Sequence, residues 1–159
     1  MTTTIEDELR AKIQHAFGKV SAPPPGDLLQ GVYAGNDDAF EMRQAFEGKH
    51  WSDIPIKVLS HHRESVIMLS GLGYRAYLAA YLNACLANDT TYGPDVRGYT
   101  LYGLRPLSKS EVHVATARER LSLLDHDQRA VVIEVLRYLE RSWRMKEAGD
   151  VLREWESKT

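Results

Sequence analysis

Two adjacent histidines and a nearby glutamate, His61, His62 and Glu64, are the residues of this sequence best suited to metal chemistry. Imidazole nitrogens and carboxylate oxygens are common zinc ligands in proteins. Neighbouring side chains, however, point to different sides of a helix or strand, and no His-x-x-x-His pair places two imidazoles on one helix face. The spacing therefore favours a histidine pair near a helix end and predicts no bound metal. A metal-dependent hydrolase with a dispersed site built from these three residues stays open as the alternative function.

The single cysteine, Cys85, is the other candidate nucleophile. It lies in an apolar stretch, where burial raises the thiol pKa and makes cysteines inert, so we expect it to pack in the core. No serine nucleophile elbow, phosphate-binding loop or paired zinc motif occurs. These observations favour a non-catalytic protein without a cofactor over an enzyme.

Tyrosines recur at two places in the chain. Tyr74, Tyr77 and Tyr81 have i, i+3, i+7 spacing and should line one face of a helix whose only charge is Arg75. We expect their rings to be buried and their hydroxyls to be hydrogen-bonded at the edge of the core, and a role in a binding surface is the alternative.

The second tyrosine group lies in a segment rich in glycine and proline, residues 88–110, which predicts a long loop with short extended pieces near residues 99–101. Long loops on a rigid scaffold often carry recognition, and tyrosine and arginine are common interface anchors. The candidate partner-binding residues are therefore Tyr92, Arg97, Tyr99 and Tyr102.

The elements that would position these side chains are helical. Apolar periodicity and helix start and stop signals predict helices at about residues 4–17, 39–46, 53–60, 71–87, 126–143 and 147–156. Capping-box spacing marks three of the starts, at Thr3 with Glu6, Asp38 with Glu41, and Asp125 with Gln128. Residues 71–87 are apolar almost all round, so this helix should be the buried centre. We expect Leu78, Leu82 and Leu86 to be nearly fully buried.

The remaining segments are less sharply defined. A run of three prolines and a glycine predicts a second long loop at about residues 20–36, the best candidate for a mobile connection. Glu111–Leu121 has a weak helical pattern. Periodicity does not decide whether residues 65–69 are helix or strand, or whether residues 126–156 form one helix or two. The expected fold class is all-α, with residues 1–159 forming a single-domain bundle of about six helices around the central helix.

Composition excludes several classes of protein. The 159 residues carry 20 basic and 22 acidic side chains, a net charge of −2, which argues against a nucleic-acid surface. No run of 18 apolar residues predicts a transmembrane helix, so no membrane association is expected. The acidic start MTTTIEDELR does not resemble a secretory signal, which together with the single cysteine predicts a cytoplasmic protein.

Three stretches together resemble a family of uncharacterised bacterial proteins, a domain of unknown function of similar length. They are Phe46-Glu47-Gly48-Lys49-His50-Trp51, the aromatic stretch Gly73-Tyr74-Arg75-Ala76-Tyr77-Leu78-Ala79-Ala80-Tyr81-Leu82, and Leu123-Leu124-Asp125-His126-Asp127-Gln128-Arg129-Ala130. Ala79 stands where the family commonly has proline. The resemblance covers roughly residues 38–143 and implies a helical domain with the same order of elements, but no activity.

A helical domain with a tyrosine-rich loop and no catalytic motif fits a protein that binds another protein. Such a protein could be an adaptor, or an immunity protein that neutralises a toxin. The sequence therefore predicts a non-catalytic protein-binding module, with the metal-dependent hydrolase as the alternative.

Overall fold

The ends of the long helices are set by side chains that bond to free backbone N–H groups. The computed structural model describes residues 2–33, 35–105 and 118–157. Helix α1 (Ile5–Phe17) begins after Thr4, whose hydroxyl accepts from the Asp7 N–H at 3.1 Å while the Asp7 carboxylate accepts from the Thr4 N–H. The capping box is thus one residue beyond the predicted Thr3–Glu6 pair. Helix α7 (His126–Ser142) has the predicted box of Asp125 and Gln128.

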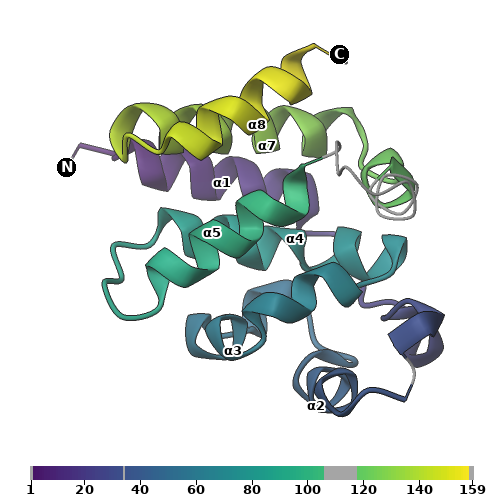
Figure 1. The fold of residues 1–159 in the computed structure, drawn as a ribbon. Helices are drawn as coiled ribbons and strands as arrows, with labels where there is room; N and C mark the ends of the chain where they lie inside the picture. The colour runs from purple at the N-terminus through teal and green to yellow at the C-terminus, as the bar shows by residue number, and fades with distance from the viewer. Residues whose placement is uncertain (1, 34, 106–117, 158–159) are drawn as a thin grey trace.

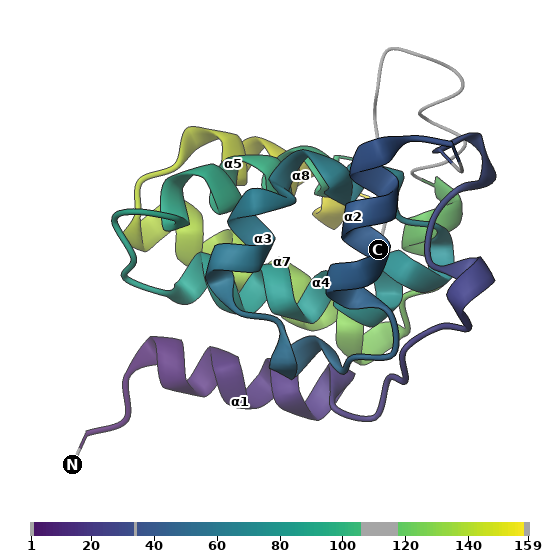
Figure 2. The same cartoon turned by 90° about the horizontal axis from the view of Figure 1, so that it is seen from below.

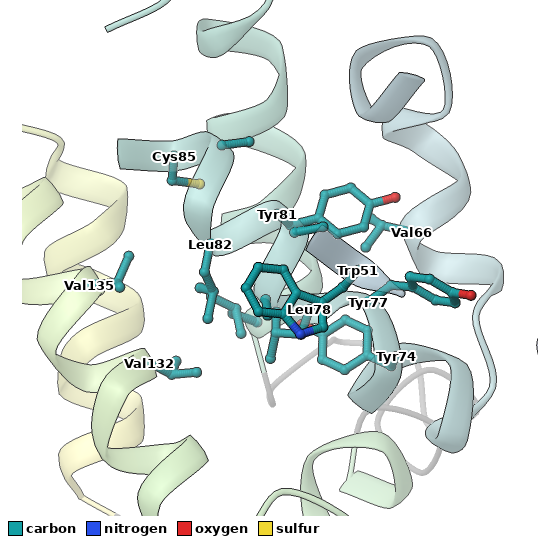
Figure 3. Close-up of a cluster of buried hydrophobic side chains, with 14 of the residues drawn as sticks. Trp51, Val66, Tyr74, Tyr77, Leu78, Tyr81, Leu82, Cys85, Val132 and Val135 are labelled. Atoms are coloured by element: carbon teal, nitrogen blue, oxygen red, sulfur yellow. The ribbon is translucent and has the colours of Figure 1, made fainter. Parts of the chain in front are cut away.

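Helix α4 (Gly71–Leu86) is the centre of the molecule, as the sequence predicts. It contacts α1, α5 and α7, and also α3 (Ile56–His61) and the 3₁₀ turn η3 (Trp51–Asp53). Leu78, Leu82 and Leu86 are at most 2% exposed, which confirms their predicted burial. In Figure 3, Leu82 lies on the side of α4 that faces Val132 and Val135 of α7, while the tyrosine rings occupy the other side.

The segment between α1 and α2 (Asp37–Phe46) is bonded to the chain just before α4. It contains two 3₁₀ turns, η1 (Pro25–Asp27) and η2 (Gly31–Tyr33). Between them, Leu28 and Leu29 are buried, and Leu29 pairs with Leu69 in an isolated β-bridge. The Gln30 amide donates to the carbonyls of Ile67 and Leu69, at 2.9 and 3.2 Å. These bonds hold a segment that the sequence suggested as a mobile connection.

Close backbone approach explains the glycine at the start of α4. A Cβ atom at Gly73 would collide with the carbonyl oxygen of Leu28. The absence of a side chain at Gly73 therefore lets this segment pack directly on the first turn of α4.

Two predicted helices differ in detail from the structure. Helix α2 starts after Asn36, whose side-chain oxygen accepts from the N–H groups of Asp38 and Ala39, so the predicted Asp38–Glu41 box is wrong. The predicted helix 53–60 is divided into η3 and α3, because Pro55 is in an extended conformation between them. Residues 65–69, left open from the sequence, fall mostly within the 3₁₀ helix η4 (Arg63–Met68).

The C-terminal part forms two helices rather than one. Helix α7 ends at Ser142 and α8 covers Lys146–Glu156. Arg144 between them has a φ of 52°, a left-handed conformation that ends the first helix. Gly149 lets the two helices pack closely, because a Cβ there would lie 2.7 Å from the Glu140 carboxylate. The helix predicted at Glu111–Leu121 lies mainly outside the described residues, and residues 118–122 are helical.

The helices form three tiers (Figure 1): α1, α7 and α8 lie above, α4 and α5 (Gly93–Leu104) in the middle, and α2 and α3 below. Figure 2, seen from below, has α2 and α3 nearest the viewer and α1 along one side. Within the described residues there is no β-strand beyond the isolated bridge, so the predicted all-α class is confirmed. None of the helices described is both long enough and apolar enough to span a bilayer.

Candidate binding surface

The segment that carries the four predicted partner-binding residues is largely a helix. Residues 93–104 form α5, with Pro94 in its first turn, where a missing N–H costs nothing. A turn precedes the helix, in which the Asp89 carboxylate accepts from the N–H groups of Thr91 and Tyr92. The prediction of a loop with extended pieces over residues 88–110 is therefore wrong for 93–104, and residues 106–110 lie outside the described part of the chain.

One face of α5 packs into the core against α4. Its buried residues include Val96, Thr100, Leu101 and Leu104, each at most 3% exposed. A Cβ at Gly103 would meet the Tyr74 ring and hydroxyl at ordinary contact distance, between 3.6 and 3.7 Å. Packing against α4 thus holds a glycine-rich sequence in a helix that its own propensity does not favour.

Arg97 lies inside the protein, contrary to the expectation of an exposed anchor. It is 4% exposed, and its guanidinium donates to the carbonyls of Cys85 at 3.1 Å and Ala87 at 2.7 Å. Its carbon Cζ lies 3.7 Å from the centre of the Trp143 ring. A cation at this position satisfies the last carbonyls of α4 and is favoured by the negative end of the helix dipole. Arg97 therefore connects α5 to the end of α4 and is out of reach of a partner.

The three tyrosines differ in their exposure. Tyr92 and Tyr99 are half-buried, whereas Tyr102 is 60% exposed. The Tyr99 hydroxyl donates to the Glu64 carboxylate at 3.1 Å, and this bond is the main cause of its raised pKa. Arg63 lies over the Tyr99 ring, 5.9 Å from its centre, and forms a 3.9 Å ion pair with Asp95.

The outer face of α5 consequently presents a free aromatic ring beside charged groups of both signs. We call this surface, formed by Arg63, Glu64, Asp95, Gly98, Tyr99 and Tyr102, the α5 outer face. A Cβ at Gly98 would meet nothing within 4 Å, so the backbone there is open to solvent. Sequence reasoning found its two tyrosines but missed Arg63, because nothing in the spacing indicates that η4 lies beside α5. It missed Asp95 and Gly98 because a segment predicted to be a loop gives no reason to place residues three or four positions apart on one face.

The histidine pair and Glu64, its proposed third ligand, contact different neighbours. His61 is exposed and lies 3.6 Å from the carboxylate of Glu41, on α2. His62 is 7% exposed and packs edge-on against Phe46, and its desolvation, followed by the neighbouring His61, lowers its pKa. Glu64 accepts its hydrogen bond from Tyr99 instead. Among the described residues, no group of three or more potential ligands is arranged to hold a metal ion.

The tyrosines of α4 are core residues. Tyr74, Tyr77 and Tyr81 are at most 1% exposed and point into the bundle (Figure 3). The Tyr77 hydroxyl lies 2.6 Å from the carbonyl oxygen of Phe46 and 2.9 Å from that of Lys49, and burial raises its pKa to about 12. The hydroxyls of Tyr74 and Tyr81 are buried and lack a hydrogen-bond partner in the described structure. The predicted pattern of buried rings with bonded hydroxyls therefore holds for Tyr77 alone.

Cys85 also lies in this core. It is fully buried and unpaired, and burial raises the pKa of its thiol to about 11. At neutral pH the thiol is therefore protonated, and the side chain acts as a small apolar group.

Comparison with known proteins identifies the family. Residues 5–157 match the model of a family described as "Family of unknown function (DUF6714)", so the chain belongs to that family. This confirms the resemblance to an uncharacterised family noted in the sequence. No curated protein and no solved structure matches the chain significantly.

Proposed function

We propose that this member of a family of unknown function acts by binding another protein through the α5 outer face. The observation that carries the proposal is the 60% exposure of Tyr102 on a helix whose opposite face is fully packed. A tyrosine offers a large apolar area with few rotatable bonds, which makes it a common energetic centre of interfaces. Because α5 is rigidly docked on α4, little conformational entropy is lost when a partner binds this ring.

The surroundings of Tyr102 support a polar, specific interface. The open backbone at Gly98 allows a partner to approach the helix closely. The Arg63–Asp95 pair and the Glu64 carboxylate supply hydrogen-bonding groups of both signs around the aromatic rings. An aromatic centre with a charged rim is the usual anatomy of a protein interface. The partner would bring an apolar pocket for Tyr102 and polar groups around it.

Within this proposal, an immunity protein that neutralises a toxin and an adaptor remain the two candidate roles. A toxin gene transcribed together with the gene for this chain would favour the immunity role.

The test uses a photo-crosslinking residue in place of Tyr102 in cells that make the full chain. We expect a discrete cross-linked product at position 102 and none when the same residue replaces Lys57, an exposed side chain on α3. Once the product is identified, Tyr102→Ala should weaken its binding by about 2 kcal/mol or more.

Two results would contradict the proposal. One is cross-linking of equal strength at positions 102 and 57, which indicates random encounters. The other is an identified partner whose affinity is unchanged by both Tyr102→Ala and Tyr99→Ala, which places the contact elsewhere on the molecule.

A further inference from the structure

The only charge of α4, Arg75, has no counter-ion in the described part of the chain. Its Nε is buried without a hydrogen-bond partner, and no ion pair among the described residues includes it. The rest of α4 is apolar or aromatic apart from Asn83. Placing a guanidinium partly out of water without an anion is costly, so a stability argument does not account for this residue.

Arg75 lines a cavity of about 500 Å³ between three elements of the fold. Two further basic side chains, His15 of α1 and Lys19 just beyond it, line the same cavity. Lys19 is exposed and, like Arg75, forms no ion pair within the described residues. Three basic residues from two separate parts of the chain thus line the same cavity.

Two aspartates also line the cavity, but they form no ion pair with Arg75 or Lys19. The Asp125 carboxylate accepts from the Gln128 N–H at 2.8 Å, which caps α7. Asp127 lies in the first turn of α7, where the helix dipole stabilises a carboxylate. Neither lies within 4.0 Å of a basic side chain in the described structure.

Much of the remaining wall of the cavity is apolar, although Ser21 and Gln128 also line it. The apolar part includes Val20, Pro23, Pro24 and Leu72, from the segment after α1 and from the first turn of α4. Such a cavity, with the cationic side chains of Arg75 and Lys19 beside an apolar wall, can accommodate a small molecule that has an anionic group and a nonpolar body.

We propose that this cavity binds a small organic anion, whose carboxylate or phosphate oxygens bond to Arg75 and Lys19. The planar guanidinium matches the geometry of both oxyanions, and Lys19 adds a second charge. The ligand gives Arg75 an anionic partner, which the described part of the chain does not place within ion-pair distance. This site is separate from the α5 outer face, since none of its lining residues belongs to that surface.

The test is a titration of the ¹⁵N-labelled full chain, at constant ionic strength, with inorganic phosphate and separately with benzoate. We expect saturable shifts of the Ala16, Leu72 and Gln128 amides with a Kd of about 1 mM or tighter for one of these probes. Binding of phosphate alone assigns a phosphate-bearing ligand, and binding of benzoate assigns a carboxylate with an apolar ring. Sodium chloride at the same ionic strength should produce no saturable shift.

Variants separate a binding role of Arg75 from a structural one. Arg75→Met and Lys19→Gln should each weaken binding at least about tenfold. Lys57→Gln removes the same charge from an exposed site on α3 and should leave binding unchanged. Arg75→Met should also raise the Tm, because it removes an unpaired, partly buried cation.

Three results would overturn the proposal. The first is the absence of saturable shifts with both probes. The second is an equal loss of binding in Lys57→Gln, which indicates general attraction of anions. The third is a lower Tm for Arg75→Met with the binding of Lys19→Gln unchanged, because Arg75 would then serve the fold.

Discussion

Helices α4 and α5 pack against each other and both carry tyrosines, but the tyrosines of α4 are buried whereas one tyrosine of α5 is exposed. The three tyrosines of α4 are at most 1% exposed, whereas Tyr102 of α5 is 60% exposed. Helix α4 contacts α1, α3, α5 and α7, so most of its side chains, the three tyrosines included, are buried. Helix α5 has one face on the core and one in solvent. The number of neighbours around a helix, rather than the residue type, therefore decides what a tyrosine does.

This difference predicts that substitutions fall into two groups, those that lower stability and those that weaken binding. Changes in α4 and on the inner face of α5 should lower the free energy of unfolding. Changes on the α5 outer face should leave that free energy unchanged and act on binding. The following substitutions test the comparison from the largest expected effect on stability to the smallest.

Leu82→Ala should have the largest effect, a loss of about 2–5 kcal/mol in the free energy of unfolding. Leu82 is fully buried between α4 and α7, so its truncation leaves a cavity that the bundle cannot close. Urea denaturation followed by circular dichroism measures the loss. A value below about 1 kcal/mol would show that α4 is not the centre of the fold.

Arg97→Ala should cost about 3 kcal/mol, because it removes two charge-assisted hydrogen bonds and the contact with Trp143. Arg97→Lys keeps the charge but not the fork of donors, so it should recover only part of the loss. The same denaturation experiment measures both variants. If Arg97→Ala leaves stability unchanged and weakens partner binding, the sequence-based assignment of Arg97 as an interface anchor is right and the comparison fails.

Tyr77→Phe should cost about 1 kcal/mol, because its hydroxyl bonds to carbonyls at the end of α2 and just beyond. Tyr81→Phe is the matched control in the same helix, since its buried hydroxyl has no partner in the described structure. We expect Tyr81→Phe to change stability by less than about 0.5 kcal/mol, or to increase it. Equal losses in the two variants would mean that the Tyr81 hydroxyl is bonded in solution.

Tyr102→Ala should have the smallest effect on the fold, within about 0.5 kcal/mol, as for most exposed positions. Thermal denaturation of this variant beside Arg97→Ala compares the two faces of one helix directly. A clear drop in the Tm of Tyr102→Ala would show that the ring stabilises the bundle, which contradicts its assignment to a binding surface.

The parts of the fold that could be predicted are those with local signals. Helices α1 and α7 combine a cap with an apolar stripe, and α4 is a long apolar run, so each was found almost to the residue. The capping residue is predicted less exactly where several candidates are adjacent in the sequence. Asn36, Asp37 and Asp38 can all accept a backbone hydrogen bond, and the sequence alone does not show which one is outside the helix.

Helix α5 was missed because its sequence has the signals of a loop. Gly93 and Pro94 mark a helix start here, but the same dipeptide is typical of a turn. Gly98 and Gly103 lower the intrinsic helix propensity, and packing against α4 overrides it. The burial of Arg97 was not predicted for the same reason, since its acceptors are carbonyls at the end of α4 that come near it only because α5 packs on α4.

The position of α1 has a consequence for synthesis of the chain. Its Ala16 carbonyl accepts from the Gln128 side chain, 112 positions later, and Glu6 accepts from Tyr138, 132 positions later. At the usual rate of translation, the first helix leaves the ribosome on the order of ten seconds before its partner α7. During that interval Leu9, Ile13 and Phe17, which are buried in the finished protein, have no α7 to cover them. The part of the apolar face of α1 that packs on α7 therefore stays uncovered until α7 emerges.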